Sequence, residues 1–199
     1  MRLFSTAVAA AVLLNLPGLA LAQEASVPTD NAEMAAIFVA DQAVRQNIDP
    51  ARFRDRAFVE QMNADDAARR ERTRALLDAG ALQTGEDFRA AAFVFQHGST
   101  PEDYLLAHSL AVTGVAKGSK QAAWIAAASL DRFLQSVDRK QIYGTQTRMM
   151  NVGEPTLEPY DRNLLPAAVR AAAGVPNLAE QDARLEQFRI ARQAAAPQP

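Results

Sequence analysis

The chain has 199 residues, of which 21 are basic and 23 acidic, and its formal net charge is −2. This balance argues against nucleic acid as a partner and against electrostatic binding to a membrane surface. Cysteine is absent from the sequence, which excludes disulfides, thiol catalysis and cysteine-ligated zinc, so stability must come from a packed core.

Residues 1–22 have the pattern of a cleavable secretory signal peptide. Arg2 precedes an apolar run from Leu3 to Leu14, and Ala20-Leu21-Ala22 supplies the small residues of a cleavage site before Gln23. The run of about 12 apolar residues is too short to cross a bilayer about 30 Å thick. We therefore expect export to the periplasm or the cell exterior, with no stable membrane anchor after cleavage. An uncleaved N-terminal anchor is the alternative.

The rest of the sequence predicts an all-α fold, because it contains no alternating β-branched run of strand length. We expect a polar linker over 23–30, a single domain of stacked antiparallel helices over 31–193, and a frayed tail over 194–199. Glycine and proline breaks indicate a loop over 138–163. The cap, stop and apolar patterns predict helices over 31–47, 51–79, 86–97, 101–117, 120–137, 166–173 and 178–193. Asn63 with Asp66 three residues on resembles a new cap, so the stretch 51–79 could be one helix or two, over 51–62 and 63–79.

The three middle helices have the clearest signals. Thr84 and Thr100 are expected to cap the first two, and Ser119 the third. Gly98 and Gly118 follow the first and second helices, as is typical of helix ends. Because the connecting turns are short, we expect the three helices to pack up-down-up.

Four short motifs run through the sequence. They are Asp41-Gln42-Ala43-Val44-Arg45, Gln96-His97, Asp131-Arg132 and the segment 141–146, Gln-Ile-Tyr-Gly-Thr-Gln. Over about residues 35–188 the chain resembles a family of bacterial proteins known only as a domain of unknown function, which shares these motifs. Residues 82–87, LQTGED, depart from the aromatic-proline segment that relatives carry there. The resemblance implies a helical fold and a place for a site, but no activity.

Helical spacing predicts that these motifs meet at one end of the stack. His97 and Asp131 each lie 11 residues past the start of two parallel helices, so both sit about 16 Å along their axes. Asp41 and Arg45 are one turn apart and could join the cluster or pair with each other. The expected site residues are Gln96, His97, Asp131, Arg132, Gln141, Tyr143, Thr145 and Gln146.

The same residues have a structural interpretation. His97 could simply bond the last carbonyls of its helix, and Asp131 with Arg132 could pin the segment 141–146 onto the bundle. His108 and Trp124 are expected to belong to the core. The charged run 65–74 is expected to be a solvated helix face with pairs such as Asp66–Arg70.

Two functions fit the sequence. The first is a binding or interaction module for a small molecule or peptide, because the site is rich in amides and no nucleophile motif is present. The alternative is a hydrolase or lyase in which His97 acts as general acid/base, oriented by Asp131. We expect no metal and no cofactor, because two histidines without a ligand spacing such as H-E-x-x-H do not indicate a metal site.

Export leads to the first prediction. The mature protein should begin at Gln23, because Ala20-Leu21-Ala22 is the one well-placed cleavage site after the apolar run. Intact-mass spectrometry of the protein recovered from outside the cytoplasm measures this directly, and a mass that includes Met1 would contradict it.

Overall fold

The computed structural model describes residues 27–46, 49–148 and 153–194. These residues form helices and loops without a strand or sheet, which confirms the all-α fold. The expected signal peptide, residues 23–26 of the expected linker and residues 195–199 of the expected tail lie outside the described residues. The elements are α1 (Ala32–Ala43), η1 (Pro50–Arg54), α2 (Arg56–Asp78), α3 (Gly85–Phe95), α4 (Pro101–Ala116), α5 (Ala122–Ser136), α6 (Ala167–Ala172) and α7 (Leu178–Ala194).

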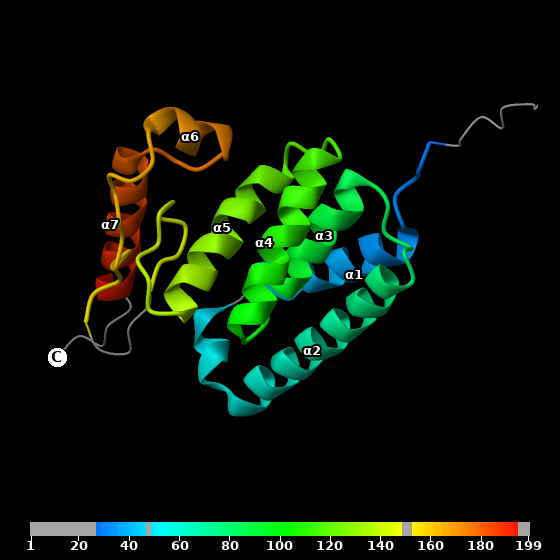
Figure 1. Cartoon of the computed structure of the whole chain (residues 1–199). Coiled ribbons are helices and arrows are strands. Elements are labelled where there is room, and N and C mark those ends of the chain that lie inside the picture. Colours follow the sequence, from blue (N-terminus) through cyan, green and yellow to red (C-terminus); the bar gives the residue numbers. More distant parts are fainter. Residues whose placement is uncertain (1–26, 47–48, 149–152, 195–199) are drawn as a thin grey trace, which may run out of the picture.

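Helices α3, α4 and α5 lie side by side and run up-down-up, as the sequence predicts (Figure 1). Capping boxes start the first two. Thr84 Oγ1 accepts from the Asp87 N–H while the Asp87 carboxylate accepts from the Thr84 N–H, and Thr100 and Asp103 repeat the arrangement. Each box satisfies N–H groups that the first turn of a helix leaves unpaired.

Small residues set the distance between these helices. A Cβ built on Gly85 would lie 2.8 Å from the Ser119 nitrogen and 3.0 Å from the Gly114 carbonyl oxygen, so α3 and α4 approach as closely as their backbones allow. Alanines fill most of the remaining contact. The buried core includes Ala90, Ala91, Ala92, Val94, Phe95, Ala107, Ala111, Ala122, Ile125 and Ala128.

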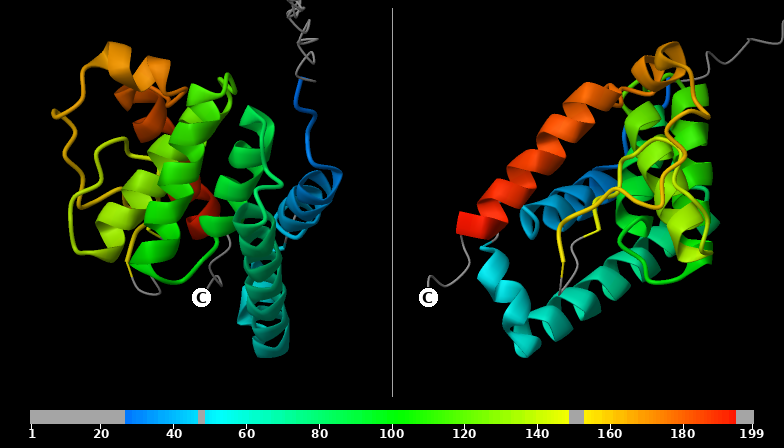
Figure 2. Two further views of the ribbon diagram at one scale, coloured as in Figure 1. Left: turned by 45° about the vertical axis from the view of Figure 1, so that its right-hand side comes forward. Right: turned by 90° about the vertical axis from the view of Figure 1, so that its left-hand side faces the viewer.

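Helix α1 packs against α3, and the long α2 crosses beneath the stack (Figure 2). The alternative of separate helices over 51–62 and 63–79 is wrong. Asp55 caps α2 by accepting from the N–H groups of Ala57 and Phe58, so Asn63 lies inside one continuous helix. The residues before Asp55 form the short 3-10 turn η1 instead.

The start of α5 also differs from expectation. Ser119 does not cap the helix: its hydroxyl donates to Glu86 Oε1 at 2.5 Å and so ties the α4–α5 turn to α3. The helix begins at Ala122 without a side-chain cap. A long-range partner therefore overrides the local capping signal.

Residues 137–148 and 153–166, between α5 and α6, are mostly loop, as expected, with two isolated β-bridges, Gln141–Tyr160 and Arg148–Thr156. A second, smaller apolar cluster of Leu157, Tyr160 and Leu185 lies between this loop and α7. Figure 1 shows α6 and α7 beside the α5 edge of the stack. This edge carries one of the two polar networks described below.

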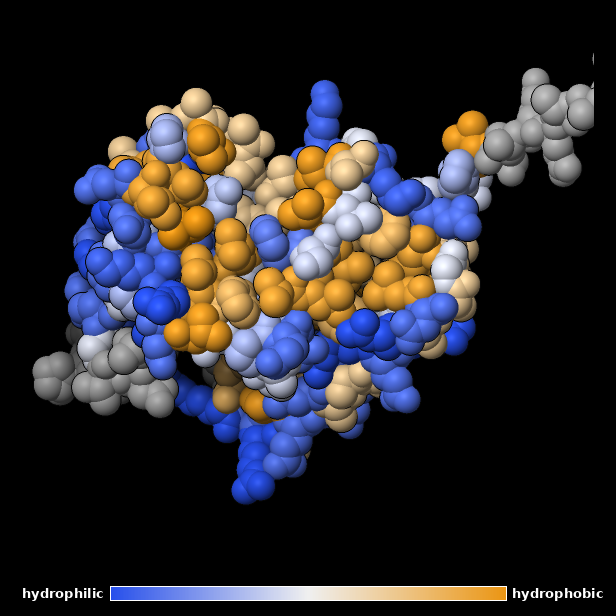
Figure 3. All heavy atoms as spheres, in the orientation of Figure 1, coloured by the Kyte–Doolittle hydropathy of each residue, from blue (hydrophilic) through white to orange (hydrophobic). Residues whose placement is uncertain are grey.

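The face seen in Figure 3, where the three-helix stack lies in front, is largely apolar. Leu105, Val112 and Val115 of α4 are exposed. Trp124 of α5, which the sequence places in the core, is 38 % exposed, although its ring stacks on Phe93 with 6.0 Å between centroids. Within the part of the chain that the structure describes, no helix is long and apolar enough to cross a membrane.

Burial of Phe95 yields a stability prediction. The ring is 3 % exposed in the main core and also carries the Arg74 guanidinium at 5.1 Å from its centroid. Phe95→Ala should lower the free energy of unfolding by about 3–5 kcal/mol, since it leaves a cavity in the core. Urea denaturation followed by circular dichroism measures the loss. The control Val39→Ala, at an exposed position, should change it by less than about 0.5 kcal/mol.

Candidate functional site

The predicted polar cluster is divided between two networks that meet different faces of α5. Asp131 and Arg132 are neighbours in the sequence, but Asp131 binds the segment 141–146 while Arg132 donates to Gln96 at the end of α3. His97 bonds to Asp41 rather than to Asp131. The expected pairing of His97 with Asp131 is therefore wrong, because both oxygens of Asp131 are already occupied by the loop.

The Asp131 network is sealed. The side chain is fully buried, and Oδ1 accepts from the N–H groups of Ile142 at 2.8 Å and Tyr143 at 3.0 Å. Oδ2 accepts from the N–H and the hydroxyl of Thr145 at 2.9 and 2.8 Å. Each lone-pair direction of the carboxylate is thus used by the loop, which fits a structural role.

Two glutamine side chains hold the same loop together through hydrogen bonds. Gln141 is fully buried; its Oε1 accepts from the Gln146 N–H, and its Nε2 donates to the carbonyls of Gln146 and Leu157. Gln146 donates from Nε2 to the Ala128 carbonyl of α5. These amides satisfy one another and the backbone, so they are held as part of the fold.

The loop in turn holds the C-terminal helices. The Tyr143 carbonyl accepts from the Tyr160 hydroxyl, from Arg170 and from Gln181. Gly144 has φ of +77°, and a Cβ there would lie 2.4 Å from Gln181 Oε1. Only glycine fits this turn, because it combines a left-handed backbone with contact against a packed side chain.

The second network centres on a buried carboxylate beside a histidine. His97 Nδ1 lies 3.0 Å from Asp41 Oδ1, and the His97 side chain is 13 % exposed while that of Asp41 is 1 % exposed. In a neutral imidazole the nitrogen facing a carboxylate carries the proton, so Nε2 presents a lone pair. The pair has the geometry of an acid/base dyad.

Arginines hold this carboxylate in place. Arg45 donates from Nη1 to Oδ1 of Asp41 at 3.3 Å and from Nη2 to Oδ2 of Asp66 at 2.5 Å. Arg69 binds Oδ1 of Asp66, and its Nε lies 3.6 Å from Asp41 Oδ1. Asp66 is buried and pairs with Arg45 and Arg69 instead of Arg70, so the expected solvated face over 65–74 is wrong at this point.

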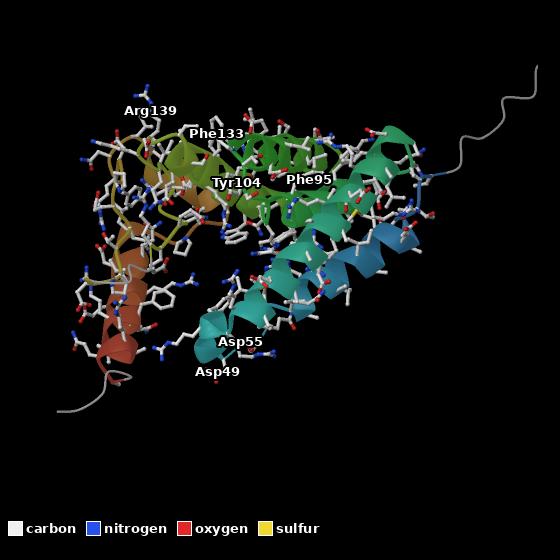
Figure 4. The ribbon with its side chains drawn as sticks, turned by 90° about the horizontal axis from the view of Figure 1, so that it is seen from below. Asp49, Asp55, Phe95, Tyr104, Phe133 and Arg139 are labelled. Atoms are coloured by element: carbon white, nitrogen blue, oxygen red, sulfur yellow. The ribbon has the colours of Figure 1, made fainter. Side chains whose placement is uncertain are left out.

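Three donors meet the carbonyls that follow α3. Arg132 donates to the Gln96 carbonyl at 3.2 Å, Arg70 to the His97 carbonyl at 2.9 Å, and the Tyr104 hydroxyl to the Gly98 carbonyl at 3.0 Å. Cations are favoured here because the C-terminal end of a helix carries partial negative charge. Figure 4 looks onto this underside, with Tyr104 and Phe95 near its centre.

Burial and the charges of the network shift the pKa values of both His97 and Asp41. Burial lowers the pKa of His97, and Arg45 and Arg132 lower it further, while Asp41 opposes the shift without offsetting it. Burial alone would raise the pKa of Asp41, but bonds and charges from His97, Arg45 and Gln42 outweigh it and lower the pKa. At neutral pH the pair is therefore a carboxylate beside an uncharged imidazole.

The network, which we name the His97 cluster, contains Asp41, Arg45, Asp66, Arg69, Arg70, His97 and Arg132. With His97 uncharged, four arginines face two aspartates, although the whole chain is acidic. The Nε–H groups of Arg69 and Arg132 are buried without a hydrogen-bond partner. Among the described residues, no group of three or more His, Asp or Glu side chains could hold a metal ion.

Sequence reasoning missed part of this cluster. Asp66, Arg69, Arg70 and Tyr104 were not among the expected site residues, and the first three sit in a run whose charges resemble an ordinary surface helix. The one signal in the sequence was Asp41 with Arg45, one turn apart. His108, expected in the core, is half-buried and bonds the Ala126 carbonyl at 2.9 Å.

Comparison with known proteins adds no relative: no protein-family model matches the chain, and neither a curated protein nor a solved structure is found to match it. The candidate site therefore rests on the geometry above.

The sealed Asp131 network predicts a large effect of a small change. Asp131→Asn replaces one accepting oxygen by an N–H₂ donor that faces the Thr145 N–H or the Ile142 and Tyr143 N–H groups. It should lower the free energy of unfolding by about 1–3 kcal/mol and the melting temperature by about 2–4 °C for each kcal/mol.

The matched control is Asp138→Asn, just beyond the same helix. Asp138 is exposed and has φ of +57°, a conformation that asparagine adopts readily. Differential scanning calorimetry should find that Asp138→Asn has the melting temperature of the wild type. An Asp131→Asn protein as stable as wild type would show that the carboxylate is not what holds the loop.

Proposed function

We propose that this is an exported helical protein that binds a small molecule or a peptide through an oxyanion, a carboxylate or a phosphate group, held at the His97 cluster. The observation that carries the proposal is the unpartnered, buried Nε–H of Arg132 within a cluster that has more cations than anions. The expected polar site at one end of the helix stack thus keeps Gln96, His97 and Arg132. Asp131, Gln141, Tyr143, Thr145 and Gln146 belong to the separate loop network instead.

Arginine chemistry supports an oxyanion. A guanidinium presents several N–H donors in a plane that matches two oxygens of a carboxylate or phosphate. Arg132 uses one donor on the Gln96 carbonyl, and its guanidinium lies 5.8 Å from the centroid of the Tyr104 ring. Burial lowers the pKa of Arg132, which indicates a desolvated cation that a bound anion would stabilise.

The state of His97 supports the same ligand class. Its uncharged imidazole lies near Arg45 and Arg132, and both disfavour a further positive charge. An anion bound between them would remove that penalty and raise the pKa of His97. Binding would then take up a proton, so the affinity for the anion should increase as the pH falls through the ordinary range of a histidine.

Sulfate tests the proposal, since it is an oxyanion whose own charge is constant between pH 5.5 and 7.5. Calorimetric titration at fixed ionic strength should detect saturable binding that tightens as the pH falls. Arg132→Gln should weaken binding at least about tenfold, because a charge-assisted hydrogen bond contributes about 1.5–3 kcal/mol. His97→Gln should remove the pH dependence.

Arg139→Gln is the matched control, because Arg139 is an exposed guanidinium just beyond the end of α5. It should leave sulfate binding unchanged. If Arg132→Gln fails to fold, as judged by circular dichroism, Arg132→Lys takes its place: it keeps the charge and loses the planar donors. Equal sulfate binding by wild type and both Arg132 variants would overturn the proposal.

A second candidate is the hydrolase or lyase, with Asp41 in the place expected for Asp131. The observation in its favour is the 3.0 Å contact of His97 Nδ1 with a buried carboxylate, which leaves Nε2 to accept a proton. Turnover of 4-nitrophenyl phosphate that is lost in His97→Gln would support it. Oxyanion binding without turnover would favour the binding protein.

A further inference from the structure

We propose a second binding site, away from the His97 cluster, that takes a pyranose sugar bearing a carboxylate, that is, a hexuronic acid. The site is a small, open hollow of about 60 Å³ between the start of α5, the loop 141–147 and α7. It is lined by Trp124, Gly144, Thr145, Thr147, Leu157, Val175, Pro176, Gln181, Arg184 and Leu185.

Trp124 gives the hollow an aromatic wall. The indole is supported by Phe93, with 6.0 Å between centroids and 17° between planes, yet 38 % of the residue is exposed. A rigid, partly exposed indole suits the apolar face of a sugar ring, because it offers a large contact area and loses little side-chain entropy on binding.

The free polar groups of the hollow are mostly donors. Gln181 and the Thr145 hydroxyl are already used within the fold. Among the described residues, neither the Gly144 N–H nor the Thr147 hydroxyl has a hydrogen-bond partner. Both can therefore serve the hydroxyl oxygens of a ligand.

Arg184 selects an acidic sugar. It is the one charged side chain of the lining, it is exposed, and no ion pair joins it to an acidic residue in the part of the chain that the structure describes. A carboxylate on the ring can accept two hydrogen bonds from this guanidinium. The site is independent of the His97 cluster, since Trp124 and Arg132 lie about 12 Å apart along α5.

Trp124 is the single tryptophan of the chain, so its fluorescence reports on this hollow. Titration with sodium glucuronate at constant ionic strength should produce a saturable change in the Trp124 fluorescence. Glucose, which lacks the carboxylate, and benzoate, which has a carboxylate and a flat ring but no hydroxyls, should each bind at least about tenfold more weakly. Arg184→Gln should weaken glucuronate binding about tenfold, and Thr147→Val several-fold.

Arg189→Gln, on the same helix but outside the lining, is the control and should bind glucuronate as wild type does. Trp124→Ala, followed by calorimetry, should bind at least tenfold more weakly while keeping the helical circular dichroism spectrum. The proposal is overturned if glucuronate produces no saturable change, if benzoate or glucose binds as tightly, or if Arg184→Gln has no effect.

Discussion

The buried carboxylate of Asp131 is the interaction on which the C-terminal third of the protein depends. It accepts from the backbone of residues 142, 143 and 145 and so sets the shape of the loop. That shape turns the Tyr143 carbonyl toward Tyr160, Arg170 and Gln181, which carry α6 and α7. Burying a carboxylate without hydrogen-bond donors costs free energy, so the loop and α5 stabilise each other. The hollow beside Trp124 depends on this contact between Asp131 and the loop.

Asp131 and Asp41 are both buried carboxylates, but their partners differ in kind. Asp131 is surrounded by neutral donors of its own loop, and nothing remains to be satisfied. Asp41 is surrounded by His97, Arg45 and Arg69, and in the same cluster the buried Nε–H groups of Arg69 and Arg132 have no hydrogen-bond partner. Polar groups whose hydrogen bonds are all made within the protein rigidify the structure. Polar groups that are held close together but keep unused hydrogen-bond donors or acceptors can bind a ligand. The His97 cluster is therefore the stronger candidate for function.

Local signals predicted most of the fold and failed where a distant residue competed. Thr84 and Thr100 cap their helices as expected, because each finds its partner three residues away. Ser119 has the same local signal but bonds Glu86, 33 residues away. Asp66 resembles one charge of a solvated run in the sequence, but it is buried beside Arg45, which lies just beyond the end of α1. A single sequence shows spacing along one helix, but not which face another helix covers.

The sequence by itself determined the all-helical class, the three-helix stack and the residues from which a site could be built, because helical period, caps and glycine stops act within a few residues. Only the tertiary structure decided how those residues are shared between two networks. Asp131 and Arg132 are adjacent on α5, and their side chains leave the helix about 100° apart, so they meet different neighbours. The packing of α1 and α2 against the end of α3 brought Asp41, not Asp131, to His97.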